Sequence, residues 1–184
     1  FENTKLYEDW FWVKNRINII TKWVQNIDPN TKTVAFYDGS SISYDKLIIA
    51  TGSKPNKFGW SGQDLAGVQG LYHLQDLENM ESATQQGIKK AVVVGGGLIG
   101  IEMAEMFHSR HIPVTFLVRE ESFWNAVLPP EESEMINKHI LDNGIDLRLG
   151  EELVEIKGQH GKASAVICKN SGEVIPCEFV GLTV

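Results

Sequence analysis

Hydrophobic and polar positions divide the 184-residue chain into two parts. Residues 7–16 suit a short helix, and residues 17–44 form short, partly alternating apolar segments separated by turn-forming Asp, Pro, Asn and Gly. This pattern predicts a small antiparallel β-meander. It leads into an apolar run at residues 44–52, which ends in Thr-Gly. Such a run is typical of a buried strand that delivers its end to a site.

The second part of the chain alternates strands with helices. Residues 53–70 are rich in Gly, Pro, Ser and Asn, and they predict a linker. We expect helices at 77–86, 97–110 and 130–143, and strands at 17–20, 90–94, 114–118, 145–149, 153–157, 163–169 and 173–180, the last three antiparallel. The fold class is therefore α/β, with a Rossmann-type parallel sheet added to the meander.

The strongest motif is the glycine loop at residues 95–100, within AVVVGGGLIGIEMAE. Four apolar strand residues precede it and an amphipathic helix follows, which is the context that a dinucleotide-binding loop needs. Gly95 allows the tight turn, Gly97 lets a pyrophosphate approach the backbone, and Gly100 lets the helix pack close to the strand. The unpaired N–H groups of the helix N-terminus favour phosphate. The alternative is a tight strand–helix turn with no ligand.

The end of the next strand normally decides between the two pyridine nucleotides. That strand ends at Val118 without an acid, and Arg119 follows at once. Arg119 favours NADP, unless it is an ordinary solvated residue. Glu120 and Glu121 point the other way, because either carboxylate could bind the ribose 2′-OH of NAD and repel a phosphate. The sequence therefore predicts NADP or NAD.

Composition excludes several other functions. The net charge of −7, with no Lys/Arg run, argues against nucleic-acid binding. No apolar stretch approaches the ~20 residues of a membrane span. Two cysteines do not form a disulfide framework, which predicts a cytoplasmic protein. We expect no metal site and no catalytic side chain. Because the chain opens on Phe1 and closes on an apolar run, we expect it to be part of a longer parent protein.

Four segments, in this order, resemble a known family: SYDKLIIATGSKP, VVVGGGLIGIEMAE, GIDLRLGEELVEI and FVGLTV. They are similar to the FAD/NAD(P)-dependent pyridine nucleotide-disulfide oxidoreductases, which include NADH oxidases, rubredoxin and ferredoxin reductases and the nitrite reductase large subunit. The resemblance implies that residues 1–58 are the back part of a FAD-binding domain and 59–72 a linker. Residues 73–178 would be the NAD(P)H-binding Rossmann domain, and 179–184 a strand leading back to the FAD domain.

The resemblance also implies roles for single residues. Thr51 and Gly52 would lie near the flavin, Leu98 would cover the nicotinamide pocket, and Glu102 would lie near the nicotinamide. Val118 stands where NADH-preferring members keep a carboxylate, and Arg119 matches a phosphate-binding Arg of NADPH-using members, although Asn125 replaces their second basic residue. The predicted cofactor-binding set is Thr51, Gly52, Gly95, Gly96, Gly97, Leu98, Ile99, Gly100, Glu102, Val118, Arg119, Glu120 and Gly181.

The resemblance implies an enzyme in which hydride passes from nicotinamide C4 to N5 of FAD, and then to an unknown electron acceptor. It also allows a homodimer of the parent. Two alternatives remain open: a non-catalytic NAD(P)H-binding or sensing module, and a glycine loop that binds FAD. The flavin-facing segment argues against the first, and the meander before the loop argues against the second.

The departures from the family lead to the first prediction. The chain lacks the family's first glycine motif, which binds the FAD pyrophosphate, and a CxxxxC redox pair. We therefore expect the chain to bind pyridine nucleotide but to hold FAD poorly or not at all. An absorption spectrum of the purified chain checks this. A yellow sample with a flavin spectrum would contradict it.

Overall fold

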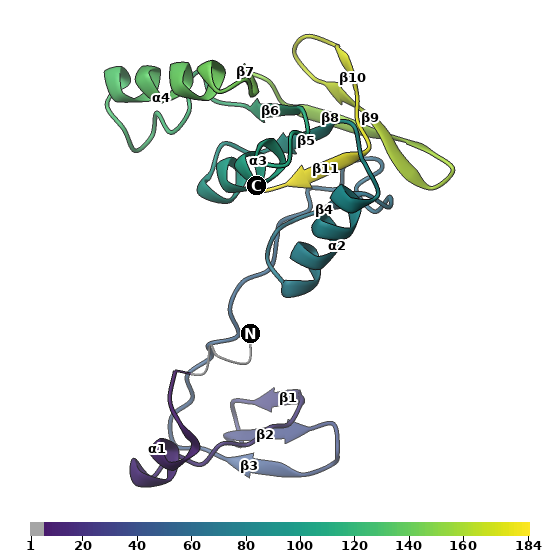
Figure 1. Ribbon diagram of the computed structural model, residues 1–184. Coiled ribbons are helices and arrows are strands. Elements are labelled where there is room, and N and C mark those ends of the chain that lie inside the picture. The colour runs from purple at the N-terminus through teal and green to yellow at the C-terminus, as the bar shows by residue number, and fades with distance from the viewer. Residues whose placement is uncertain (1–5) are drawn as a thin grey trace. The chain divides into compact units, whose positions relative to one another are not determined.

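The computed structural model describes residues 6–184, which divide after Gly52 into two compact units (Figure 1). The first unit contains helix α1 (Asp9–Lys14) and a three-stranded antiparallel sheet in the order β1-β2-β3, with β1 at Val24–Asp28, β2 at Thr33–Phe36 and β3 at Ser41–Ser43. The predicted meander is confirmed. The first turn is held by Asp28, whose Oδ1 accepts hydrogen bonds from the backbone N–H groups of Asn30 and Thr31.

Two predicted strands of the first unit do not form. Residues 17–20 and 44–52 have no regular secondary structure, and Leu47, Ile48 and Ile49 are exposed. The prediction of a buried strand over 44–52 is therefore wrong for this structure. The physical reason is pairing, because a strand needs a neighbour for its backbone N–H and C=O groups. No described strand pairs with either segment.

The second unit is built on a five-stranded sheet in which all neighbours are parallel. Its order is β4 (Val68–Gln69), β11 (Phe179–Leu182), β5 (Ala91–Val94), β6 (Val114–Val118) and β7 (Asp146–Leu149). Its helices are α2 (Leu74–Gln85), α3 (Leu98–His108) and α4 (Pro130–Asp142). A separate antiparallel sheet has the order β10-β9-β8, with β8 at Leu153–Gln159, β9 at Lys162–Cys168 and β10 at Val174–Pro176. The predicted α/β class is confirmed.

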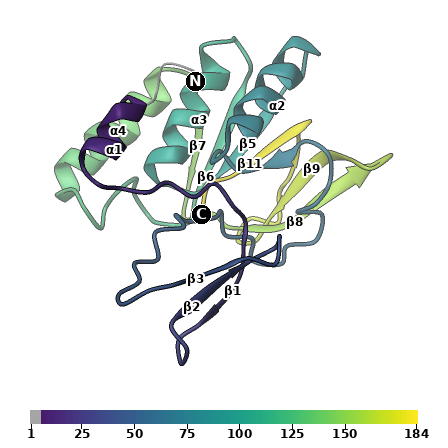
Figure 2. The same ribbon diagram turned by 90° about the horizontal axis from the view of Figure 1, so that it is seen from below.

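Both faces of the parallel sheet are buried, which explains its uninterrupted apolar strands. Alternate residues of β5 belong to two cores. Ala91 and Val93 pack with residues of the helices, including Met103 and Phe107. Val92 and Val94 pack with residues of the antiparallel sheet. The helices and the β8–β10 sheet accordingly cover opposite faces (Figure 2).

The structure corrects two boundaries. Residues 59–72, predicted as a linker, contain β4, which pairs with β11. Residues 173–180, predicted as one strand, form β10 and the start of β11, and the chain passes from the antiparallel to the parallel sheet between Pro176 and Phe179. The end of the chain therefore supplies β11, an interior strand of the five-stranded parallel sheet. The assignment of the first unit to a FAD-binding domain stays a prediction.

Gly181 lies in β11 directly beneath α3. A Cβ at this position would overlap the Sδ atom of Met103, so the glycine leaves the space that this side chain occupies. Because Met103 is fully buried in a close-packed core, its thioether has little room to move away from an added methyl group.

Gly181→Ala should therefore lower the free energy of unfolding by about 1–3 kcal/mol, the usual cost of overpacking a core. Urea unfolding followed by circular dichroism measures it. The matched test repeats the substitution in a Met103→Ala background, where the same change should cost less because the opposing sulfur is gone. An equal loss in both backgrounds would contradict this packing account.

Candidate functional site

A cleft of about 650 Å³ opens at the carboxyl ends of β5, β6 and β11. Its lining comes from residues 94–97, from the loop after β6 and from the β7–β8 turn. Phe58 and Trp60, which follow the start of the second unit, and residues 183–184 at the end of the chain complete it. After β5 the chain runs through α3 to β6 on one side, while β11 lies on the other side. The cleft therefore lies at the topological switch point, where open α/β sheets bind their ligands.

The glycine loop has the geometry of a phosphate cradle. Gly95 has φ +118°, and a Cβ there would lie 2.7 Å from the carbonyl oxygen of Thr183. A Cβ on Gly100 would overlap the carbonyl oxygen of Gly95. At Gly97, in contrast, a Cβ would meet no atom within 4 Å. Gly95 and Gly100 are thus required by the fold, whereas Gly97 leaves open space towards the cleft.

Helix α3 begins at Leu98, immediately after the loop. Its N-cap residue, Gly97, has an extended backbone and no side chain that could cap the helix. The first N–H groups of a helix have no partner within the helix, and they carry partial positive charge. The open side of the loop therefore offers backbone donors to an anion.

Thr183 fixes the loop to the end of β11. Its backbone N–H donates to the carbonyl oxygen of Val94 at 2.9 Å. Its Oγ1 donates to the same oxygen at 2.9 Å and to that of Gly95 at 3.2 Å. The sequence does not predict this role of Thr183, because a threonine after an apolar strand carries no recognisable signal and its partners are nearly ninety residues away.

The end of β6 forms the second part of the cleft. Val118 is fully buried and packs against Gly96, where a Cβ would lie 2.7 Å from its Cγ1. Arg119 and Glu120 both line the cleft, and Arg119 Nε donates to Glu120 Oε1 at 2.9 Å. The Glu120 carboxylate raises the pKa of Arg119, with a smaller contribution from the charge of Glu152.

Aromatic side chains form another part of the lining. Phe58 and Trp60 make an edge-to-face pair with ring centroids 5.3 Å apart. Trp124 lines the cleft from the loop after β6, with a left-handed backbone at φ +58°. The sequence does not predict that these rings line a cleft, because their approach depends on tertiary structure.

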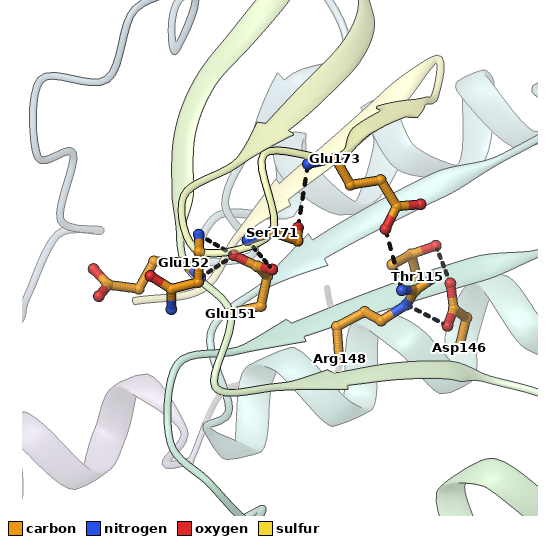
Figure 3. Close-up of polar contacts among 8 residues, drawn as sticks. Thr115, Asp146, Arg148, Glu151, Glu152, Ser171 and Glu173 are labelled. Carbon is orange, nitrogen blue, oxygen red and sulfur yellow. Dashed lines mark hydrogen bonds and ion pairs between the residues drawn. The ribbon is translucent and has the colours of Figure 1, made fainter.

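A polar network fixes the β7–β8 turn beneath the cleft (Figure 3). The Glu151 carboxylate accepts hydrogen bonds from the backbone N–H groups of Asn170 at 2.7 Å and Ser171 at 3.1 Å. Partial burial raises the pKa of Glu151, but these bonds outweigh it, and the pKa is lowered overall. Because the N–H of Glu151 also donates to Val118, the turn after β9 is tied to the end of β6.

A second set of contacts in Figure 3 joins β6, β7 and the turn before β10. Asp146 Oδ2 accepts from Thr115 Oγ1 at 3.0 Å, and its Oδ1 accepts from Arg148 Nε at 2.6 Å. Arg148 also contacts Glu173 at 3.2 Å. Partial burial raises the pKa of Asp146, but its bonds to Arg148 and Thr115 outweigh this effect and lower the pKa.

The structure brings part of the predicted set together. Gly95, Gly96, Gly97, Arg119 and Glu120 share the cleft. The remaining residues lie elsewhere: Leu98, Ile99 and Glu102 are exposed on α3, Gly100, Val118 and Gly181 are buried, and Thr51 and Gly52 belong to the first unit.

The described residues contain no cluster of three or more His, Cys, Asp or Glu that could hold a metal ion. Cys168 and Cys177 are buried free thiols, and burial raises the pKa of both, that of Cys177 to about 12. Across residues 6–184, none of the helices has the length and apolarity of a membrane span.

Comparison with known proteins identifies the family. Residues 6–184 match the family described as pyridine nucleotide-disulphide oxidoreductase. The chain belongs to this family. The chain is 29% identical, over 171 residues, to rubredoxin-NAD(+) reductase of Pseudomonas putida, an alignment that covers 92% of this chain and 44% of that protein. The chain thus spans less than half the length of this relative.

Solved structures share the fold. A ferredoxin reductase from Rhodopseudomonas palustris has a TM-score of 0.89 and 23% identity, with 100% of this chain and 45% of that chain covered. A NAD-dependent persulfide reductase from A. fulgidus has a TM-score of 0.83 and 26% identity, covering 95% of this chain and 33% of that one. The expected family and Rossmann-type fold are confirmed. The expected likeness to nitrite reductase stays a prediction.

The lowered pKa of Asp146 predicts a pH-dependent contribution to stability. A carboxylate with a lowered pKa in the folded state stabilises the protein above its unfolded pKa, and this contribution disappears as the pH falls through the folded value. Asp146→Asn should therefore lower the free energy of unfolding by about 1 kcal/mol at pH 7, as expected for a partly exposed, charge-assisted hydrogen bond.

The loss in the free energy of unfolding caused by Asp146→Asn should become smaller as the pH falls below the ordinary pKa range of carboxyl groups. Urea unfolding at a series of pH values measures it, with Glu134→Gln on the exposed side of α4 as the control. A loss from Asp146→Asn that is equal at neutral and acid pH would contradict the assigned cause.

Proposed function

We propose that this chain binds NADH or NADPH with its pyrophosphate on the glycine loop, as the pyridine-nucleotide part of a FAD-dependent oxidoreductase. The observation that carries the proposal is the open space at Gly97, directly at the N-terminus of α3 and inside the cleft. At this point an anion-attracting helix end and an approachable backbone coincide at the switch point of the sheet.

The lining of the cleft suggests how the nucleotide lies. The adenosine half extends over the end of β6, where the half-buried Trp124 and the hydrogen-bond acceptor Glu120 line the cleft. Base–aromatic stacking contributes usefully to affinity without demanding a particular base. The nicotinamide half extends from the other side of the pyrophosphate, past the exposed Leu98 and Glu102 at the start of α3.

FAD enters the proposal through the family and through residues 44–52. When bound in the parent protein, FAD would accept hydride from the nicotinamide. Thr51 and Gly52 end an apolar segment whose side chains are exposed and which no described strand pairs. We assign this segment to the flavin side of the parent. The work of the chain itself is to bind and orient the nucleotide.

The electron acceptor proposed for the parent is a redox protein. The name of the Pseudomonas putida relative contains rubredoxin, and that of the Rhodopseudomonas palustris structure contains ferredoxin. A cytoplasmic location and a homodimer stay predictions of the sequence.

Gly97→Asp tests the proposed function. The new side chain enters open space, so the fold should be retained, but its carboxylate would face the pyrophosphate. Like charges placed together at an interface cost several kcal/mol, so affinity should fall at least about a hundredfold. Calorimetric titration with NADH and NADPH measures this, and circular dichroism checks the fold.

Asn79→Asp is the control, because it introduces the same charge on α2, outside the glycine-loop cleft. It should bind as the wild type does. Wild-type affinity in Gly97→Asp, or binding of FAD with no binding of either pyridine nucleotide to the wild type, would contradict the proposal.

A further inference from the structure

One peptide of the glycine loop has no side chain on either side to restrain it. It joins the C=O of Gly95 to the N–H of Gly96, and both residues line the cleft. Glycine populates more backbone conformations than other residues, so this peptide is free to rotate unless another group holds it. Its orientation decides whether the cleft is offered an N–H donor or a carbonyl oxygen, and the donor is the group that attracts a phosphate.

The hydroxyl of Thr183 holds this peptide from the end of β11. Thr183 Oγ1 donates to the carbonyl oxygen of Gly95 at 3.2 Å, and no other described residue donates to that oxygen. The hydroxyl also reaches the carbonyl oxygen of Val94 at 2.9 Å, but that oxygen already accepts the backbone N–H of Thr183. The Gly95 carbonyl therefore depends on the hydroxyl, since without it the oxygen would keep no partner among the described residues.

The first turn of α3 encloses the same carbonyl. A Cβ on Gly100 would overlap the carbonyl oxygen of Gly95 and would lie 2.9 Å from Thr183 Oγ1. The oxygen thus points into the packing between α3 and the end of β11. The peptide is trans and planar, so its C=O and N–H point in opposite directions. The N–H of Gly96 consequently points away from this packing, and it donates to no group in the described part of the chain.

We infer that Thr183 is a positioning residue for nucleotide binding, because its hydroxyl fixes the Gly95–Gly96 peptide with the Gly96 N–H towards the pyrophosphate. The inference rests on the proposed function, since it assumes that a pyridine nucleotide lies on the glycine loop. A donor that is oriented before the ligand arrives avoids the cost of ordering it on binding. The hydroxyl thus limits the backbone freedom that the two glycines introduce.

Calorimetric titration of the full chain with NADH and with NADPH tests the role of the hydroxyl. Thr183→Val has nearly the same shape but no donor, so it should weaken binding about five- to tenfold, as expected for one lost hydrogen bond. Thr183→Ser keeps the hydroxyl and should restore binding to within about twofold of the wild type. Thr115→Val is the matched control, because it removes a hydroxyl that bonds to Asp146 in the same sheet but outside the cleft. It should bind as the wild type does.

A spectroscopic measurement separates positioning from a general loss of stability. In an HNCO spectrum of the isotopically labelled chain, one cross-peak correlates the Gly95 carbonyl carbon with the Gly96 N–H and so reports both ends of the peptide. Without ligand, Thr183→Val should move this cross-peak far more than Thr183→Ser or Thr115→Val does. In the wild type, saturating nucleotide should move the Gly96 N–H resonance more than the Gly95 carbonyl resonance, because the carbonyl is already bonded. This comparison needs no variant to fold.

Each outcome decides one claim. Wild-type affinity in Thr183→Val, or binding by Thr183→Ser that is as weak as that of Thr183→Val, would overturn the inference and leave the proposed function standing. An equal loss in Thr115→Val would also overturn it, because affinity would then follow stability. A Gly95 carbonyl resonance that moves as far as the Gly96 N–H resonance in the wild type would overturn it too, since the peptide would not be held beforehand. A wild type that binds neither nucleotide would overturn the proposed function itself.

Discussion

The close approach of α3 to the ends of β5 and β11 is the constraint on which the second unit depends. It requires glycine where a side chain would strike the backbone, at Gly95 and Gly100, and beneath Met103 at Gly181. Thr183 then fastens the loop to β11 through Val94 and Gly95. The consequence is functional as well as structural, because the same approach brings an uncapped helix end to the floor of a cleft.

The rest of the cleft is held in place by polar contacts at its edge. Glu151 ties the turn after β9 to the β7–β8 turn, and its own N–H is bonded to the last residue of β6. Arg119 and Glu120 follow that residue directly, so their position depends on contacts among three strands. These contacts fix the backbone at this edge of the cleft.

Local sequence patterns predicted the elements whose causes are local. The glycine loop was found because strand, turn and helix signals are contiguous at residues 91–105. The sequence did not predict the place of β11 inside the sheet or its pairing with β4, because both depend on partners far away in the chain. The run at 44–52 has the composition of a strand, yet composition supplies no neighbour to pair with. The ion pair of Arg119 with Glu120 could not be predicted either, because it depends on the geometry of the two side chains.

The central claim is that a pyridine nucleotide lies across the glycine loop of the second unit. Chemical-shift mapping on the isotopically labelled chain, titrated with NADH, tests it most directly. The account predicts that the largest shifts occur in the amides of residues 95–100, in Thr183 and in the indole N–H of Trp124. Shifts confined to residues 6–52, or to the opposite edge of the parallel sheet, would contradict it.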